Sequence, residues 1–218
     1  MLTVENVSYA YKNSEKAILK NVNATFEDGK LSAIVGPSGS GKTTLLSIMA
    51  GLDTPNTGTI VVDNEPLAGM DLDKYRREHV SIIFQAFQLF PLLTALENVC
   101  YPMLLAGKEK KASIEHSRKY LECVGIDAEK YKRFPSNLSG GEQQRVAIAR
   151  SLATGARLLL ADEPTGNLDV SNGDAVMEIL RELAHINGYC VIVVTHDLGI
   201  ATASDAVFRM SDGMVVKS

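Results

Sequence analysis

Residues 36–43, Gly-Pro-Ser-Gly-Ser-Gly-Lys-Thr, constrain the fold more than any other stretch of this sequence. The apolar run 31–35 precedes them and a helix-like run, 44–50, follows them, as in the strand, loop and helix that bind nucleotide phosphates. The three glycines permit backbone conformations closed to residues with a Cβ, so successive N–H groups can point at phosphates. The positive end of the following helix faces the same groups. This unit predicts an α/β core.

The residues at the end of this phosphate loop (36–43) predict what it binds. Lys42 adds a full positive charge beside the β- and γ-phosphates of a nucleoside triphosphate, and the Thr43 hydroxyl is placed to ligate Mg²⁺. A glycine-rich turn that only connected a strand to a helix would not need Lys-Thr at its end. We expect the nucleotide to contact Gly36, Pro37, Ser38, Gly39, Ser40, Gly41, Lys42, Thr43 and Thr44.

Length and charge exclude several classes of protein. A chain of 218 residues can bury one substantial core, or one core with a smaller lobe, but not two complete nucleotide-binding units. Its 45% apolar and 22% charged residues are those of a folded globular protein. The net charge of −4 gives no electrostatic reason to expect a nucleic-acid partner.

No stretch of the sequence is expected to cross a membrane or to direct secretion. The first seven residues lack the basic flank and apolar core of a signal peptide. The most apolar long region, 86–106, is interrupted by prolines and polar residues, whereas a span needs about 20 apolar residues in a row. Any membrane connection is therefore expected through a partner. Cys100, Cys123 and Cys190 lack metal-ligand spacing and are expected to be buried and reduced.

Apolar periodicity divides the chain into strands and helices. Strands are expected over 2–7, 18–26, 31–35, 59–63, 80–84, 158–161, 189–194, 206–210 and 214–217, and helices over 44–50, 71–79, 94–106, 110–124, from Ser139 to 153, and 171–186. Continuously apolar strands that alternate with helices predict a parallel sheet covered on both faces. The two strands before the phosphate loop predict a small antiparallel sheet. The strand-free block from 86 to about 152 predicts a helical lobe.

Three of these strands end in polar residues that can act on a nucleotide. The carboxyl ends of parallel strands share one edge of a sheet, so Gln85, Asp162 with Glu163, and His196 are expected to converge. Asp162 can hold Mg²⁺, and Glu163 can orient and polarise the attacking water. Gln85 can reach the metal or the water, or merely cap its strand. His196 can reach the γ-phosphate, or be satisfied by neighbouring backbone.

These assignments give two sets of candidate residues for hydrolysis without a covalent intermediate. The catalytic set is Lys42, Gln85, Glu163 and His196, and the metal set is Thr43, Gln85 and Asp162. An aromatic residue between the first two strands can stack on the base. From spacing alone, Tyr9 and Tyr11 compete for that role, and either can instead pack against its own hairpin.

Residues 138–143 read Leu-Ser-Gly-Gly-Glu-Gln, and we call this segment the signature. Through it the sequence resembles the ATP-binding subunits of ABC transporters. The resemblance covers essentially the whole chain. Its elements follow the family order: Tyr11, 36–43, Gln85, 138–143, Asp162 with Glu163, Asn167-Leu168-Asp169, and His196. It favours Tyr11 over Tyr9 as the residue that stacks on adenine, and it implies ATP and Mg²⁺ as cofactors.

The resemblance implies a P-loop NTPase fold, with a RecA-like parallel sheet core, an N-terminal antiparallel β subdomain and an inserted α-helical subdomain. Residues 1–218 would form a single ABC ATPase domain. Its nucleotide-binding core would comprise 1–85 and 157–218, and the helical subdomain with the signature would comprise 86–156.

Subunits of this family act as head-to-tail dimers around two ATP molecules, which implies a second copy of this chain as a partner. Ser139, Gly140, Gly141 and Glu142 of one subunit would then complete the site of the other. Their amide-rich helix start suits a γ-phosphate and is expected to lack a lysine of its own. Residues 168–169 would communicate between the two sites.

The stretch 162–169, with Gly-Asn where many members carry Ser-x, resembles the lipoprotein-releasing, macrolide-efflux, antimicrobial-peptide-resistance and cell-division ATPases of bacteria. Glu142 where Gln is common and Ser151 where Ala is usual are mild departures. The family's groove for the permease corresponds to 86–102, although some of these residues must pack inside the helical lobe.

The expected function is hydrolysis of ATP that drives a separate membrane permease of the export, extraction or mechanotransmission type, on the cytoplasmic face of a bacterial membrane. An ATP-driven regulatory switch on an envelope or cell-division complex, which moves no substrate, would use the same catalytic residues and is the alternative. A DNA-repair or translation ATPase is disfavoured, because those relatives carry coiled-coil or zinc insertions, or two cassettes in one chain.

Overall fold

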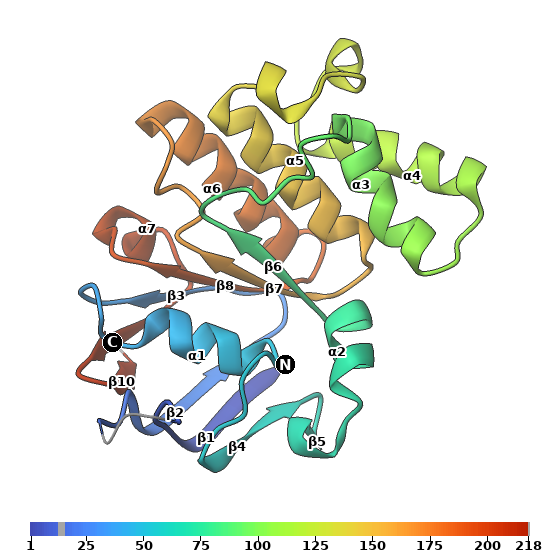
Figure 1. Ribbon diagram of the computed structural model, residues 1–218. Coiled ribbons are helices and arrows are strands. Elements are labelled where there is room, and N and C mark those ends of the chain that lie inside the picture. The colour runs from blue at the N-terminus through green and yellow to red at the C-terminus, as the bar shows by residue number, and fades with distance from the viewer. Residues whose placement is uncertain (13–15, 218) are drawn as a thin grey trace.

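A computed structural model describes residues 1–12 and 16–217. Figure 1 shows two sheets separated by a helix, with a group of helices on the far side of the larger sheet. The strands are β1 Leu2–Tyr9, β2 Leu19–Phe26, β3 Leu31–Val35, β4 Thr57–Val62, β5 Glu65–Pro66, β6 Val80–Phe84, β7 Leu158–Asp162, β8 Cys190–Thr195, β9 Ala206–Ser211 and β10 Met214–Lys217. The α-helices are α1 Lys42–Met49, α2 Leu72–Glu78, α3 Ala95–Leu105, α4 Lys110–Cys123, α5 Gly140–Ala153, α6 Val170–His185 and α7 Leu198–Thr202.

The larger sheet has the order β10-β9-β3-β8-β7-β6, and every neighbouring pair is parallel except β9 with β10. β3 and β8 are buried along their whole length, as the continuous apolar runs in the sequence require. The predicted parallel sheet is confirmed, and the strands expected at 206–210 and 214–217 are present as the antiparallel pair β9 and β10. Because β3, β6, β7 and β8 run in one direction, their carboxyl ends lie at one edge.

The smaller sheet is antiparallel, with the order β2-β1-β4-β5. The expected small sheet is therefore present, and the strand after the phosphate loop joins it. The strand expected at 59–63 begins earlier, since Thr57 and Gly58 already belong to β4. Gly58 has a φ of 79°, and a Cβ there would lie 2.4 Å from the Glu5 and Asn6 carbonyl oxygens, so only glycine fits this irregularity of the β1–β4 pairing.

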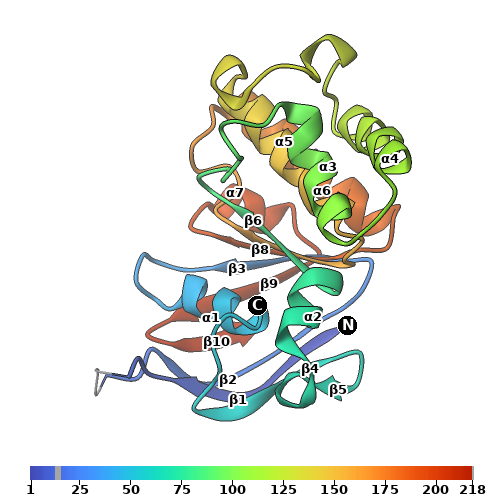
Figure 2. The same cartoon turned by 45° about the vertical axis from the view of Figure 1, so that its right-hand side comes forward.

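Helix α1 lies between the two sheets and holds them together (Figures 1 and 2). Leu45 and Ile48 are fully buried in a cluster that draws side chains from both sheets. Burying one such side chain contributes about 1.5–3 kcal/mol, so the position of α1 is strongly fixed. The phosphate loop enters this helix, so that loop is anchored between the two layers.

The opposite face of the large sheet packs against α5 and α6, and α3 and α4 pack beyond them (Figure 2). Thr94 and Ser139 each start a helix with a reciprocal capping box, to Glu97 and Glu142 respectively. One continuous apolar cluster joins the sheet face to the helices of 86–156. The division of the chain into 1–85 with 157–218 and 86–156 stays a prediction.

The short elements β5 and α7 were not predicted from the sequence, and the expectation for one cysteine was wrong. β5 and α7 have only two and five residues, too few to show a period. Cys123 is exposed near the end of α4, whereas Cys100 and Cys190 are buried as expected. Among the helices of residues 1–12 and 16–217, none is both long and apolar enough to span a membrane.

Candidate nucleotide-binding and hydrolysis site

The phosphate loop curls tightly between β3 and α1. Gly39 and Gly41 have φ values of 75° and 107°, in the left-handed region that favours glycine. Gly36 is needed for space, because a Cβ there would lie 2.1 Å from the Met210 carbonyl oxygen. A larger residue could therefore not occupy any of these three positions without strain.

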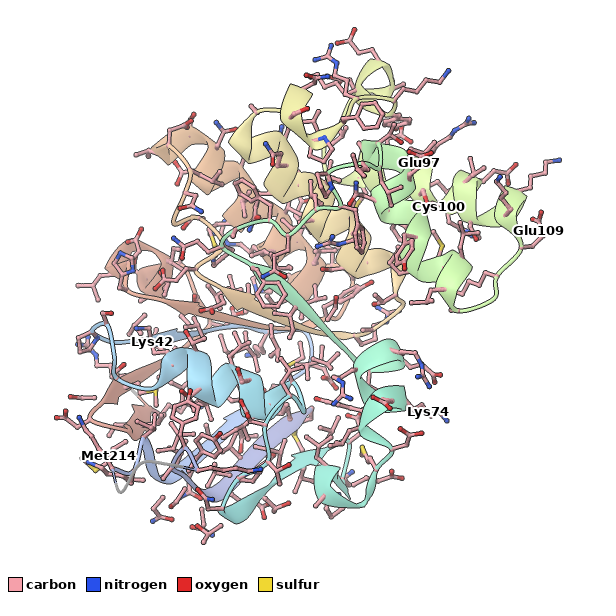
Figure 3. All side chains as sticks on the ribbon, in the orientation of Figure 1. Lys42, Lys74, Glu97, Cys100, Glu109 and Met214 are labelled. Atoms are coloured by element: carbon pink, nitrogen blue, oxygen red, sulfur yellow. The ribbon has the colours of Figure 1, made fainter. Side chains whose placement is uncertain are left out.

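Lys42 turns its ammonium back over the loop, and Figure 3 shows it at the start of α1. Its Nζ donates to the carbonyl oxygens of Gly36 at 2.8 Å and Pro37 at 3.0 Å. The lysine is 7% exposed, so a positive charge is held inside a curl of backbone amides. Such a curl attracts an anion.

The start of α1 is left open for a ligand. Among the α-helices of the described chain, α2 to α7 each begin with a side chain that caps the first amides. α1 has no such cap and no acidic residue in its first turn. The first N–H groups of a helix have no partner within the helix, so those of α1 need an acceptor from elsewhere.

A cavity of about 660 Å³ lies beside this helix start. Ten of its eleven lining residues were predicted from the sequence: Tyr11, Ser38, Gly39, Gly41, Lys42, Thr43, Thr44, Gln85, Glu163 and His196; Ile18 was not. The Tyr11 ring is half exposed, its hydroxyl lies 3.1 Å from Thr44 Oγ1, and it meets Tyr9 edge to face. The volume is within the range of small-ligand sites.

The other loop residues lie behind this surface. Gly36 and Pro37 hold Lys42 through their carbonyl groups. The Ser40 hydroxyl is buried without a hydrogen-bond partner among the described residues, while its carbonyl accepts from the Gly213 amide at 3.1 Å. Burying a hydroxyl without a hydrogen-bond partner costs free energy. An anion bound in the loop would supply the missing acceptor for Ser40.

Asp162 does not line the cavity, but it contacts Thr43, which does, because β7 and α1 approach each other there. The Thr43 hydroxyl donates to Asp162 Oδ1 at 3.3 Å. Burial raises the pKa of Asp162; Glu163 raises it further, while the Thr43 hydroxyl and Lys42 lower it. A desolvated carboxylate with little compensation is suited to gain a cation.

Glu163 is held in one orientation. Its Oε1 lies 2.9 Å from His196 Nδ1, and its Oε2 accepts from the Thr195 hydroxyl at 3.2 Å. Its backbone has a φ of 48°, rare for a residue with a side chain, and its amide donates to the Val194 carbonyl at 2.9 Å. With its carboxylate held in this way, Glu163 lines the cavity.

Gln85 begins a distorted loop after β6. Phe87 and Gln88 have φ values of 57° and 48°. The Arg150 guanidinium of α5 donates to their carbonyl oxygens at 3.1 and 2.6 Å and lies over the Phe90 ring. Burial lowers the pKa of Arg150. These hydrogen bonds keep a strained loop in place.

The signature residues Ser139, Gly140, Gly141 and Glu142 do not line the cavity. A Cβ on Gly140 would lie 3.5 Å from the Leu168 side chain and 3.7 Å from the Phe87 ring. Contrary to the expectation of a helix start without a lysine, Lys130 lies 3.2 Å from Glu142, and it also pairs with Asp127. The fold of one chain therefore separates these four residues from the phosphate loop.

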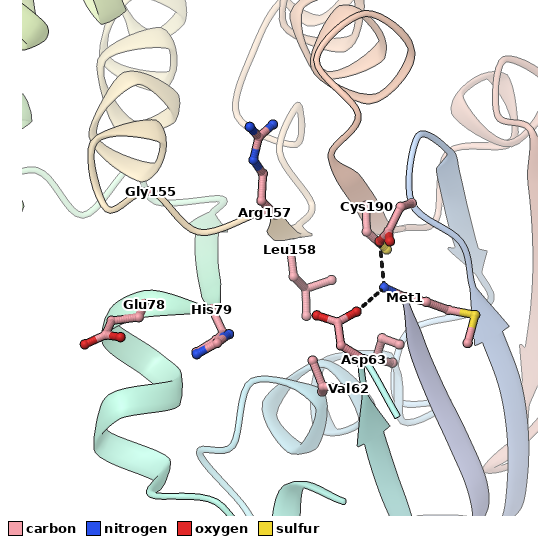
Figure 4. A pocket seen from close by; sticks show the side chains of 11 residues that line it. Met1, Val62, Asp63, Glu78, His79, Gly155, Arg157, Leu158 and Cys190 are labelled. Carbon is pink, nitrogen blue, oxygen red and sulfur yellow. Dashed lines mark hydrogen bonds and ion pairs between the residues drawn. The ribbon is translucent and has the colours of Figure 1, made fainter. Parts of the chain in front are cut away.

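A second cavity, of about 140 Å³, lies at the amino ends of β7 and β8 (Figure 4). The Met1 ammonium lies there, 2.7 Å from both Asp28 and Asp63. It has no phosphate loop, and parallel sheets bind ligands at the other edge. The larger cavity is therefore the candidate site.

The residues present fit a nucleoside triphosphate with Mg²⁺. The uncapped helix start, the buried ammonium and the unpartnered Ser40 hydroxyl can all interact with an anion. In the described part of the chain, no three His, Cys, Asp or Glu side chains could hold a metal by themselves, and Mg²⁺ commonly completes its ligands with phosphate oxygens. Fold and site together define a P-loop nucleoside triphosphatase.

Comparison with known proteins gives the family. The model described as "ABC transporter" matches residues 19–166. The uncharacterised ABC transporter ATP-binding protein MJ0796 of Methanocaldococcus jannaschii is 43% identical over 224 residues, which cover 99% of this chain and 95% of that protein. The lipoprotein-releasing system ATP-binding protein LolD of Shewanella frigidimarina is 43% identical, with 99% and 92% covered. This chain belongs to the ABC transporter family.

Solved structures agree with this membership. A dimeric structure of MJ0796 superposes with a TM-score of 0.89 at 39% identity, covering 99% of this chain and 96% of that one. A post-hydrolysis state of MJ0796 bound to ADP and Pi gives 0.90 at 38% identity, covering 100% and 98%. The chain is an ABC-type ATPase subunit that binds and hydrolyses ATP, with the expected P-loop fold.

Sequence reasoning missed several residues that shape the site. Thr195 directly follows the strand expected at 189–194, and Gln144 and Arg150 lie within the helix expected from Ser139 to 153. Gln144 is fully buried in α5, and its amide donates to the Pro164 carbonyl at 2.8 Å, one residue after Glu163. The helix pattern gave no signal for Gln144 or Arg150, because it does not show which amide or guanidinium is buried and therefore needs a partner.

Proposed function

We propose that this chain drives a separate membrane permease as a head-to-tail dimer that closes around two ATP molecules. The observation that carries the proposal is that two groups of residues needed for one site lie at different places on the chain. One cavity gathers the phosphate loop with Gln85, Glu163 and His196, while the signature helix start lies elsewhere on the same chain. Two copies facing each other would bring these surfaces together.

Within each site, the phosphate loop and Lys42 bind the phosphates, and Tyr11 stacks on the base. Thr43, Asp162 and Gln85 would hold Mg²⁺, which supplies charge neutralisation at the phosphates. Glu163 orients the attacking water and accepts its proton, with His196 and Thr195 keeping the carboxylate in position. Hydrolysis then consists of positioning and charge stabilisation.

The signature of the second copy would cover the phosphates through Ser139 and the amides of Gly140 and Gly141. These amides lie at the first positions of α5, where the helix itself offers no acceptor. Glu142 bonds to the Ser139 amide at 2.7 Å and so holds the helix start in shape. ATP would link the two copies, and its hydrolysis would release them.

Mixing two inactive variants tests the shared site. Lys42→Ala lacks the phosphate-loop charge, and Gly140→Asp adds a carboxylate that repels phosphate but is compatible with a helix start. Each variant alone should lose most ATPase activity. Their mixture should regain part of it, because each mixed dimer has one site with both Lys42 and Gly140 intact.

Gly140→Ala is the control, since a Cβ at this position meets Leu168 at an ordinary 3.5 Å and adds no charge. It should lose much less activity than Gly140→Asp. A mixture no more active than its two components, at concentrations where wild-type chains dimerise, would contradict the shared site.

We also propose that residues 86–102 contact the permease, on the cytoplasmic face of a bacterial membrane. Leu92 is 86% exposed, and Phe90 and Tyr101 pack against each other while remaining partly exposed. Exposed apolar groups on one segment are typical of an interaction surface. MacB of Escherichia coli, named an ATP-binding/permease protein, is 39% identical across 99% of this chain, which spans 34% of that protein.

Leu92→Asp should abolish recovery of this chain with its permease from membranes, because a carboxylate cannot enter an apolar contact without a partner. ATP hydrolysis by the isolated chain should persist, since Leu92 does not line the nucleotide cavity. The measurement is co-purification from native membranes, with the equally apolar and exposed Ile186→Asp on the end of α6 as control. Undiminished recovery of the Leu92 variant would contradict this surface.

A further inference from the structure

Gln85 and Asn167 are joined by two hydrogen bonds. Gln85 Nε2 donates to Asn167 Oδ1 at 3.2 Å, and Asn167 Nδ2 donates to the Gln85 backbone carbonyl at 2.9 Å. Gln85 also lines the nucleotide cavity. The pair links the loop after β6 to the loop after β7, whose residues 166–167 the sequence singled out as Gly-Asn.

These two bonds determine which end of the Gln85 side-chain amide is held by Asn167. A backbone carbonyl can only accept a hydrogen bond, so Asn167 must present its NH₂ group to it. Asn167 then turns its oxygen outward, and that oxygen can only accept. Gln85 must therefore give its own NH₂ group to Asn167. Its carbonyl oxygen, Oε1, takes no part in these two bonds.

Gly166 provides the space for this arrangement. A Cβ at position 166 would lie 2.8 Å from Gln85 Nε2 and 3.2 Å from Gln85 Cδ. Gly166 does not have a positive φ, so an alanine would be compatible with the backbone. The conflict falls on the end of the Gln85 side chain alone.

The backbone that carries Gln85 is held separately. Arg150 binds the carbonyls of Phe87 and Gln88, two and three residues further on. The loop is therefore fixed from α5, while the side-chain amide is fixed from residues 166–167. The two can be perturbed independently.

We infer that Gly166 and Asn167 are positioning residues that orient the Gln85 amide, so that its oxygen and not its nitrogen faces the metal side of the nucleotide site. The inference rests on the proposed metal role of Gln85. Mg²⁺ accepts oxygen ligands, and an NH₂ group turned toward it would repel it. Residues 166–167 thereby determine how the Gln85 amide is oriented in the active site, although they do not line the nucleotide cavity themselves.

Gly166→Ala tests whether the absence of a Cβ at position 166 is needed to orient Gln85, and Gly173→Ala is its control. A Cβ at Gly173, in α6, meets Thr165 at an ordinary 3.5 Å, and Gly173 does not line the cavity. Gly166→Ala should lower kcat about tenfold or more and raise the Mg²⁺ concentration needed for half-maximal activity, because a misplaced ligand weakens the site. KM for ATP should change by less than about twofold, and Gly173→Ala should resemble the wild type.

Asn167→Ala and Asn167→Asp test the hydrogen bonds. Alanine removes both bonds, whereas aspartate keeps an acceptor for Gln85 but sets a second oxygen against the Gln85 carbonyl. Both should shift the side-chain amide resonances of Gln85 in NMR spectra of the nucleotide-free chain. Melting temperatures should stay near the wild type, because the pair is exposed.

The decisive comparison is made in a Gln85→Ala background. If Gly166 and Asn167 act through Gln85, replacing either of them there should change kcat by less than about twofold. Losses of the same size in both backgrounds, or unshifted Gln85 resonances in the Asn167 variants, would overturn the inference. A Gln85→Ala variant as active as the wild type would instead overturn the proposed role of Gln85, and the inference with it.

Discussion

Glu163→Gln should lose about 10²–10⁴-fold in the rate of ATP hydrolysis, since a general base contributes about that factor. Glutamine keeps the size of the side chain and can still accept from Thr195, so the site should keep its shape. It removes a negative charge beside Asp162 and the phosphates, so ATP should bind at least as well. The expected result is a chain that binds ATP and rarely hydrolyses it.

Such a chain should accumulate as an ATP-bound dimer. Phosphate release measures the loss of turnover, and gel filtration with ATP and Mg²⁺ measures the dimer. Glu115→Gln, the same change on the exposed face of α4, is the matched control and should behave as the wild type. A Glu163 variant that stays monomeric while saturated with nucleotide would count against the ATP-linked dimer, and one with normal turnover against the role of Glu163.

Lys42→Ala should weaken ATP binding roughly ten- to a hundredfold. A hydrogen bond to a charged group contributes about 1.5–3 kcal/mol, and each 1.4 kcal/mol is a factor of ten in affinity. The ammonium also bridges the carbonyls of Gly36 and Pro37, so the loop loses an internal support. Calorimetry with ATP and Mg²⁺ measures the affinity.

Lys42→Met separates these two effects, because it keeps the apolar stem and removes only the charge. Both Lys42 variants should bind ATP more weakly than Lys111→Ala, which removes an exposed lysine on α4. Unchanged affinity in the Lys42 variants would show that the backbone amides alone hold the phosphates.

The prediction from sequence went furthest where chemistry depends on local spacing. The phosphate loop could be read directly, since its glycines and Lys42 act within eight consecutive residues. The convergence of Gln85, Glu163 and His196 followed from one rule about parallel strands, and these residues do line one cavity. Their individual roles remain predictions, as does the division into subdomains.

Contacts between distant segments were beyond sequence reasoning. The bonds of Arg150 to the Gln85 loop and of Asn167 to Gln85 each join residues more than sixty positions apart. Nothing in a helix pattern distinguishes an arginine that binds strained carbonyls from one that is solvated. The positive φ of Glu163 could not be predicted from the sequence either, because the Glu163 amide bonds to Val194, which only the β7–β8 pairing brings close.

The sequence by itself determined that a triphosphate site lies between a strand and a helix, because the loop that forms it is contiguous and its glycines have few alternative conformations. Tertiary structure alone decided the orientation of the groups around that site. It separated the signature from the phosphate loop, turned Glu163 toward His196, and gave Gln85 a neighbour that leaves its oxygen free. Orientation depends on hydrogen bonds between loops that only the folded sheet brings together.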